Sequence, residues 1–241
     1  IIIFILLVFI IRKYLRFSLA FNSEWFKKHL FFGGKTILVS LVSETSGKID
    51  IFLISFFLNN HNVGIYSFAS TICNGILMIP AAVATNFNPI ISKLWYEGKI
   101  EELQVKVTYI KSILKKVMIP VVLLSAIVFP IIVFFILDNK SYAENIHIYY
   151  IILIGVSFLG TYNFMGGFLT MTGKPEIQFF HSFIALFFNV TMNIILINLY
   201  GITGAAISMS LLNFFIIVSM GYFIKWKTNI DLLPKRLMLL K

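Results

Sequence analysis

Residues 91–137 read ISKLWYEGKIEELQVKVTYIKSILKKVMIPVVLLSAIVFPIIVFFIL, a lysine-rich segment that leads directly into a long apolar run. Every lysine of this stretch lies within residues 91–116, whereas the apolar run covers residues 113–137. A helix rises about 1.5 Å per residue, so the run is long enough to cross the roughly 30 Å of hydrocarbon in a bilayer. The stretch therefore predicts a transmembrane helix that follows a basic loop.

Further apolar runs give the whole chain the pattern of a polytopic membrane protein. They cover residues 1–11, 36–58, 63–90, 146–170, 176–198 and 203–224. The mean hydropathy of +0.92 and the 12% share of charged residues agree with this class, because soluble domains carry about 25% charged residues. We therefore expect an all-α, polytopic transmembrane helix bundle with about seven crossings.

The distribution of basic residues predicts the orientation of this bundle. Eighteen of the 20 Lys and Arg residues lie in alternate gaps between the runs: 12–35, 91–116, the gap at Lys174, and 225–241. Lys140 lies in an intervening gap, and Lys48 lies inside a run. By the positive-inside rule the basic gaps are cytoplasmic. The pattern thus predicts a multi-pass protein of the bacterial plasma (inner) membrane, with residue 1 outside and the C-terminus in the cytoplasm.

The chain begins inside an apolar run. As a helix, residues 1–11 would span about 16 Å, which is less than the thickness of the hydrocarbon core. Neither a basic segment before them nor a small-residue cleavage site after them indicates a signal peptide. We expect them to be the end of a transmembrane helix whose start is missing, so that the chain is part of a longer bundle.

Several classes of function are disfavoured by the sequence. The net charge of +10 comes from basic residues in short gaps beside apolar runs, where anionic lipid is the expected partner. No cluster of residues has the spacing of metal ligands, and no glycine-rich phosphate loop precedes a helix. We therefore expect the lipid bilayer as a partner, and no nucleic acid, metal or cofactor. A membrane enzyme such as a glycan polymerase or ligase is a weaker alternative, because the outer gaps are only a few residues long.

The run TILVSLVSETSGKIDIFLISFFL, residues 36–58, places Glu44, Lys48 and Asp50 near mid-membrane. Each charge costs about 2.5–3.5 kcal/mol at the centre of a helix, whereas each large apolar residue returns only about 0.3–0.6 kcal/mol. These side chains must therefore face protein or water. Glu44 and Lys48 are four residues apart and can pair on one helical face, whereas Asp50 needs another partner. Gly47 would let the helix loosen between them.

Two interpretations of this charged run remain open. In the first, the cluster lines a cavity that binds an anionic group or relays protons, with Lys48 as the leading candidate. In the second, Glu44 and Lys48 form a structural ion pair that fixes packing between helices. We favour the functional interpretation, since charge inside a membrane is costly and usually retained for a task.

A second polar stripe runs through His181, Asn189 and Asn193, which are spaced by multiples of four and share one helical face. We include them among the candidate residues for substrate binding or coupling. The simpler interpretation is that the asparagines join helices through hydrogen bonds and that His181 is a satisfied histidine near the interface. Small residues are expected to let helices pack closely at Gly155, Gly160, Gly166, Gly167, Gly204, Ala205 and Ser208.

Residues 60–70 and 89–104 resemble segments of the polysaccharide flippases. These are the O-antigen and capsule repeat-unit exporters of the multidrug/oligosaccharidyl-lipid/polysaccharide exporter superfamily. These proteins carry an acidic residue in a helix, an outer V-G-x-Y turn and an inner S-x-L-x-x-E-G stretch. The corresponding residues here are Asp50, Val63-Gly64-Ile65-Tyr66, and Ser92, Leu94, Glu97 and Gly98. Residues 172–178 (TGKPEIQ) and 200–206 (YGITGAA), with Asn189 and Asn193, also resemble the closing helices of that family's second lobe. The resemblance covers nearly the whole chain.

The resemblance implies a two-lobe exporter fold with about six helices in each lobe. It predicts a C-terminal fragment that divides into the following parts: 1–11, the end of a truncated helix of the first lobe; 12–35, a cytoplasmic basic linker; 36–224, a six-helix second lobe; and 225–241, a cytoplasmic basic tail.

The resemblance also implies a function. Such a transporter would flip an undecaprenyl-pyrophosphate-linked oligosaccharide by alternating access, for O-antigen, lipopolysaccharide or exopolysaccharide synthesis. It would use a coupling proton or sodium ion and work with polysaccharide assembly proteins, and Lys48 could contribute to a cationic cavity. The alternatives are a cation-coupled multidrug exporter of the same superfamily, with Glu44 or Asp50 as its ion site, and a flippase for the peptidoglycan lipid precursor.

Overall fold

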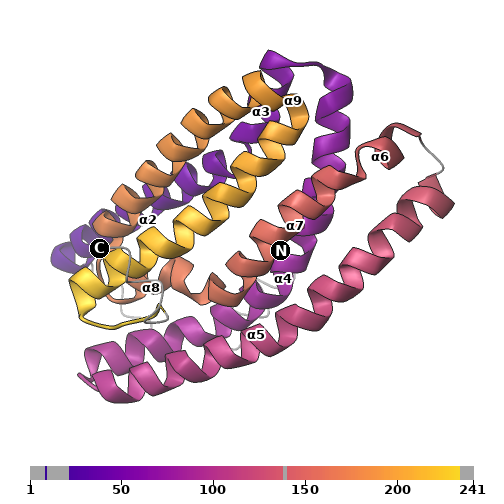
Figure 1. Ribbon diagram of the computed structural model, residues 1–241. Helices are drawn as coiled ribbons and strands as arrows, with labels where there is room; N and C mark the ends of the chain where they lie inside the picture. Colours follow the sequence, from indigo (N-terminus) through magenta and orange to yellow (C-terminus); the bar gives the residue numbers. More distant parts are fainter. Residues whose placement is uncertain (1–8, 10–21, 138–139, 234–241) are drawn as a thin grey trace. The chain divides into compact units, whose positions relative to one another are not determined.

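The computed structural model describes residues 9, 22–137 and 140–233, and every regular element in these ranges is helical (Figure 1). This confirms the prediction of an all-α protein. The chain divides into two units, Ile1–Gly34 and Lys35–Lys241. The predicted helix end at 1–11, apart from Phe9, and residues 12–21 of the predicted linker lie outside the described residues. So do residues 234–241 of the predicted tail.

The described part of the first unit contains the start of helix α2, Ser23–Ser46, which continues into the second unit. Asn22 caps this helix: its side-chain oxygen accepts hydrogen bonds from the backbone N–H groups of Glu24 at 3.0 Å and Trp25 at 3.1 Å. Asparagine is a preferred residue at this position, because it satisfies N–H groups that have no partner inside the helix. The last part of the predicted linker is therefore helical.

The second unit holds the rest of α2 and the helices that follow it. These are α3 (Ile49–Phe57), α4 (Asn60–Tyr96), α5 (Ile100–Ile131) with a π-helical extension (Ile132–Leu137), α6 (Lys140–Glu144), α7 (Ile146–Tyr162), a 3-10 helix η2 (Asn163–Gly167), α8 (Phe168–Met171) and α9 (Pro175–Thr228).

Helix α9 consists of two helices joined at Gly201. Its 54 residues would extend for about 81 Å as one straight helix, more than twice the thickness of the hydrocarbon core. Gly201 has φ 58° and ψ −138°, a conformation that residues with a side chain rarely adopt. At this point the chain reverses, and the second half of α9 (yellow) runs back beside the first (orange) in Figure 1.

Four helical stretches in the described ranges are long and apolar enough to cross a membrane: Asn60–Tyr96, Ile100–Leu137, Ile146–Met171 and Pro175–Thr228. The predicted number of about seven crossings is therefore not confirmed. The predicted crossing at 1–11 lies outside the described residues, apart from Phe9. The predicted crossings at 176–198 and 203–224 are the two halves of α9, and the predicted crossing at 36–58 is interrupted between α2 and α3.

The helices of the second unit pack around two apolar clusters. The first joins α3, α4, α5 with its π-helical extension, α7 and the middle of α9, and includes Ile54, Tyr66 and Tyr149. The second joins the last part of α4, the start of α5, η2, α8 and the end of α9. In contrast, only 11% of the most apolar stretch of α5 is buried, which suits a surface that faces lipid.

Glycines allow close approach where the helices cross. A Cβ atom on Gly155 of α7 would lie 2.6 Å from the Cα of Ser210 on α9. One on Gly160 would lie 2.3 Å from the terminal carbon of Met118, and one on Gly204 would overlap the carbonyl oxygen of Leu196. These contacts confirm close packing at Gly155, Gly160 and Gly204, whereas Gly166 has no neighbour within 4 Å of its Cβ position.

The chain folds back after α9. Asn229 adopts a left-handed conformation with φ 56° at the C-cap, which asparagine tolerates better than most residues. Ile230 and Leu232, at 0% and 3% exposure, then enter the second apolar cluster. The Lys111 ammonium donates to the Leu232 carbonyl at 3.2 Å, and Lys225 pairs with Asp231 at 3.1 Å. The fold-back segment, residues 229–233, is thus fixed by both apolar and polar contacts.

Candidate functional site

A break between α2 and α3 forms the centre of the candidate site. Helix α2 ends at Ser46, α3 begins at Ile49, and Lys48 has φ −119° and ψ −10°. This confirms the prediction that the helix loosens at Gly47. An interrupted helix in a membrane must find new partners for its freed carbonyl groups. Here the side-chain amide of Asn189 donates to the Ser46 carbonyl at 2.9 Å.

Asp50 lies just after the break and is buried, with 4% of its surface exposed. The Tyr66 hydroxyl donates to one carboxylate oxygen at 2.8 Å, and the Asn193 amide donates to the other at 2.8 Å. The same amide donates to the Asn189 side-chain oxygen at 2.6 Å. Asp50 therefore has partners other than Lys48, as predicted.

We refer to Ser46, Asp50, Tyr66, Asn189 and Asn193 as the Asp50 cluster. Three of its members were predicted site residues, and the structure brings these three together. Tyr66 and Ser46 were not recognised as members. The signal for Tyr66 was its place in the V-G-x-Y turn, because a buried hydroxyl needs a polar partner.

Glu44 and Lys48 do not belong to this cluster. Both are exposed, and across the described ranges neither side chain forms an ion pair or a hydrogen bond. The ion pair of the second, structural interpretation is therefore not formed among the described residues. Residues four apart share a face only in a continuous helix, and the backbone leaves the helix at Gly47 and Lys48.

His181 lies in the first half of α9, 2% exposed. Its Nε2 atom is 2.8 Å from the Ser219 hydroxyl on the second half of α9. The histidine thus has a polar partner, in line with the simpler interpretation of the sequence. It does not contact the Asp50 cluster directly.

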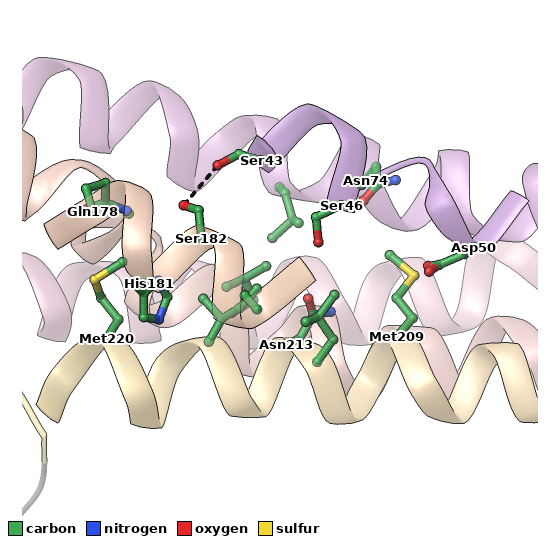
Figure 2. Close-up of a pocket in the computed structure, with 17 residues that line it drawn as sticks. Ser43, Ser46, Asp50, Asn74, Gln178, His181, Ser182, Met209, Asn213 and Met220 are labelled. Carbon is green, nitrogen blue, oxygen red and sulfur yellow. Dashed lines mark hydrogen bonds between the residues drawn. The ribbon is translucent and has the colours of Figure 1, made fainter. Parts of the chain in front are cut away.

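A cavity of about 290 Å³ lies between the helices beside these residues (Figure 2). Its polar lining is formed by Ser43, Ser46, Asp50, Asn74, Gln178, His181, Ser182 and Asn213. In Figure 2, Asp50 and Met209 lie at one end of the cavity and Gln178 and Met220 at the other. The Ser43 hydroxyl donates to that of Ser182 at 3.2 Å across its wall.

The chemistry of the Asp50 cluster is that of a lone carboxylate held by neutral donors. Within the part of the chain that the structure describes, no basic side chain forms an ion pair with Asp50. A buried charge without a counter-charge is costly, so the carboxylate is suited to take up a proton or a small cation. Among the described residues, no group of three or more His, Cys, Asp and Glu side chains is placed to hold a metal ion.

An all-helical, multi-pass bundle with polar groups buried at a broken helix has the features of a membrane transporter. The comparison with protein families agrees. Residues 36–195 match the model of the MatE family. The match covers more than half of the chain, and the chain belongs to this family of membrane exporters, whose members are transporters rather than enzymes.

Two curated proteins of Methanocaldococcus jannaschii are similar to the chain. The uncharacterized membrane protein MJ1375 is 28% identical over 162 residues, which are 67% of this chain and 37% of that protein. The uncharacterized membrane protein MJ1068 is 29% identical over 215 residues, 87% of this chain and 40% of that protein. The chain thus spans about two fifths of the length of these relatives. No solved structure matches it.

Proposed function

We propose that the protein carrying this chain flips a lipid-linked oligosaccharide, with an undecaprenyl-pyrophosphate carrier, across the bacterial inner membrane by alternating access. Membership of an exporter family supports a transport role. The order of the motifs around Asp50, Tyr66 and Glu97, which resembles polysaccharide flippases, supports this substrate class. The product would serve surface polysaccharide synthesis, including O-antigen, lipopolysaccharide or exopolysaccharide.

The observation that carries this proposal is the position of Lys48. Its side chain is exposed at the break between α2 and α3, and the described residues offer it no ion-pair partner. An ammonium group at membrane depth does not face hydrocarbon, so this surface borders a wet passage or another part of the protein. A pyrophosphate group crossing the membrane needs compensating positive charge along such a passage, and Lys48 can supply it.

In this proposal the Asp50 cluster couples transport to a proton or a sodium ion. Taking up a cation would remove the net charge of Asp50 and weaken the interactions that hold Ser46, Asn189 and Asn193 at the helix break. Because these residues connect α2, α3 and the first half of α9, a change in one charge would alter how the helices pack.

The proposed arrangement in the membrane follows the sequence. In this proposal residues 36–224 form the second lobe, and the described residues 22–35 and 225–233 lie on the cytoplasmic side. Polysaccharide assembly proteins are the expected functional partners.

Lys48→Ala tests the substrate assignment. We expect a fall of about tenfold or more in surface polysaccharide, since a hydrogen bond to a charged group contributes about 1.5–3 kcal/mol. Lys48→Arg should retain most of the polysaccharide, because it keeps the charge. Lys140→Ala, which removes an exposed lysine from the predicted outer gap, is the matched control. Normal polysaccharide in Lys48→Ala, at normal expression, would overturn the role of this residue.

A cation-coupled multidrug exporter is the second candidate, and the buried carboxylate of Asp50 favours it equally. Asp50→Asn separates the two candidates, since it removes the charge with little change in shape. For a flippase, surface polysaccharide should fall while resistance to toxic cations is unchanged. The opposite result, with drug efflux lost and polysaccharide normal, would establish the multidrug exporter.

A further inference from the structure

The cavity beside the Asp50 cluster is elongated. Along the second half of α9 its lining runs from Met209 to Met220, and eleven helical residues span about 16 Å. Asp50 and Met209 mark one end, whereas Gln178 and Met220 mark the other (Figure 2). Gln178 is three residues from Pro175, where α9 begins, and is therefore about 5 Å from the end of the helix. The cavity thus leads from the buried carboxylate toward one end of the bundle.

Two buried polar atoms on the lining have no protein partner. Gln178 and Asn213 are each 4% exposed. The side-chain oxygen of Gln178 and the side-chain nitrogen of Asn213 form no hydrogen bond with any described residue. Buried polar groups of this kind are normally satisfied by ordered water. Gln178 and Asn213 lie on different halves of α9 and line the same cavity, so ordered water in that cavity can bind both side chains.

The cavity is large enough to hold several water molecules. Each water molecule occupies roughly 30 Å³ in the liquid, and the cavity measures about 290 Å³. Hydroxyl and amide groups at Ser43, Asn74 and Ser182 provide further partners along it. Of the residues that line the cavity, Asp50 and His181 are the two that titrate. Tyr66 of α4, whose hydroxyl donates to Asp50, and Lys48, two residues before Asp50 at the helix break, are the nearby titratable groups outside the lining.

We propose that this cavity is filled with water and conducts protons between Asp50 and the aqueous phase at the Gln178–His181 end of the bundle. In this step a proton leaves water at that end and passes along the hydrogen bonds of the cavity water. It then binds a carboxylate oxygen of Asp50, which changes from −1 to neutral. With the predicted orientation, the proton comes from the cytoplasmic side.

The hydrogen bonds of Asp50 suit a carboxylate that takes up a proton. Its two oxygens accept from an O–H group of Tyr66 and an N–H group of Asn193, and both donors are neutral. The coupling role of this path rests on the proposed transport function, whereas its hydration does not.

Hydroxyl-radical footprinting of the purified native protein in lipid nanodiscs tests the hydration. Radicals generated from water oxidise methionines that touch water. Met209 and Met220 line the cavity, and Met220 also belongs to the second apolar cluster. Met118 belongs to the first apolar cluster and does not line the cavity. Met220 and Met118 are equally buried, at 2% exposure, and form a matched pair. We expect Met220 to be oxidised at least about fivefold faster than Met118, because ordered water lies beside it. Equal oxidation rates for the two would overturn the proposal.

Infrared spectroscopy tests the arrival of protons at Asp50. A carboxylic-acid band that forms after a drop in pH, and that Asp50→Asn abolishes, reports the protonation of this residue. Ala185→Leu narrows the cavity between its two ends and should slow the appearance of the band, whereas Val128→Leu, on the exposed side of α5, should not. A carboxylic-acid band that forms equally fast in Ala185→Leu and Val128→Leu would overturn the proposed proton path.

Both measurements use purified protein without a transport substrate. If the flippase assignment fails, normal polysaccharide in Lys48→Ala will show it while leaving the footprinting result unaffected. If the water path fails, Met220 will stay unoxidised whatever the substrate is.

Discussion

At the scale of single residues, Asp50 is the buried group on which the candidate site depends. Its carboxylate has two neutral donors, Tyr66 and Asn193, and within the described ranges it has no basic partner. Such an arrangement satisfies the hydrogen bonds of the carboxylate without fixing its charge state. A carboxylate with a lysine or arginine partner would stay ionised, so the absence of such a pair from the described residues suits a residue whose charge must change.

Tyr66→Phe tests how strongly the cluster depends on the hydroxyl donor. Removing one partner of a buried hydrogen bond costs about 1–3 kcal/mol when the other partner is left unsatisfied. We therefore expect a lower midpoint for thermal unfolding in detergent. Tyr109→Phe is the control, because Tyr109 is 63% exposed on α5 and its hydroxyl can bind water or lipid headgroups. A midpoint unchanged in Tyr66→Phe would contradict the described hydrogen bond.

The sequence was sufficient to predict that Asp50 is buried and needs a partner, because charge at membrane depth is costly. It could not identify Tyr66 or Asn193 as the donors, since these residues come from other helices and meet Asp50 only through tertiary packing. Helical spacing made a Glu44–Lys48 pair possible, and the described structure does not form it because the helix ends between these residues.

At the scale of helices, two interruptions define the second unit: the break at Gly47 and Lys48, and the reversal at Gly201. Both were visible in the sequence, the first as a glycine beside charges and the second as a short gap between two apolar runs. Their geometry was not predictable from sequence. The first interruption is stabilised by Asn189, which is more than 140 residues away along the chain.

Gly201→Ala tests the reversal within α9. At φ 58° and ψ −138° a side chain introduces backbone strain of about 1–3 kcal/mol. We therefore expect a lower unfolding midpoint and a smaller yield of folded protein. In Gly75→Ala no such loss should occur, because Gly75 lies inside α4 with open space around its Cβ position and without a positive φ. Equal stability of Gly201→Ala and Gly75→Ala would show that the reversal within α9 does not require a glycine at position 201.

At the scale of the molecule, the basic residues predict which ends of the helices face the cytoplasm. Lys106 lies between the start of α5 and its apolar run, and Lys140 begins α6 beyond the other end of that run. The positive-inside rule therefore places these lysines on opposite sides of the membrane. This orientation stays a prediction.

Cysteine labelling of intact cells tests that orientation. In a Cys73→Ala background, Lys140→Cys should react with a thiol reagent that cannot cross the membrane. Lys106→Cys should react only after the cells are opened. Both lysines are exposed, so they form a matched pair. The reverse pattern would contradict the predicted orientation, and labelling of both in intact cells would contradict the crossing between them.

The fold-back segment, residues 229–233, has a consequence for the biosynthesis of the protein. Ile230 and Leu232 complete an apolar cluster whose other members lie in helices that leave the ribosome earlier. Until Leu232 emerges, the start of α5 lacks both this apolar cover and the carbonyl group that Lys111 binds. Membrane insertion can therefore place the helices in turn, whereas closure of this end of the bundle must wait for translation to pass Leu232.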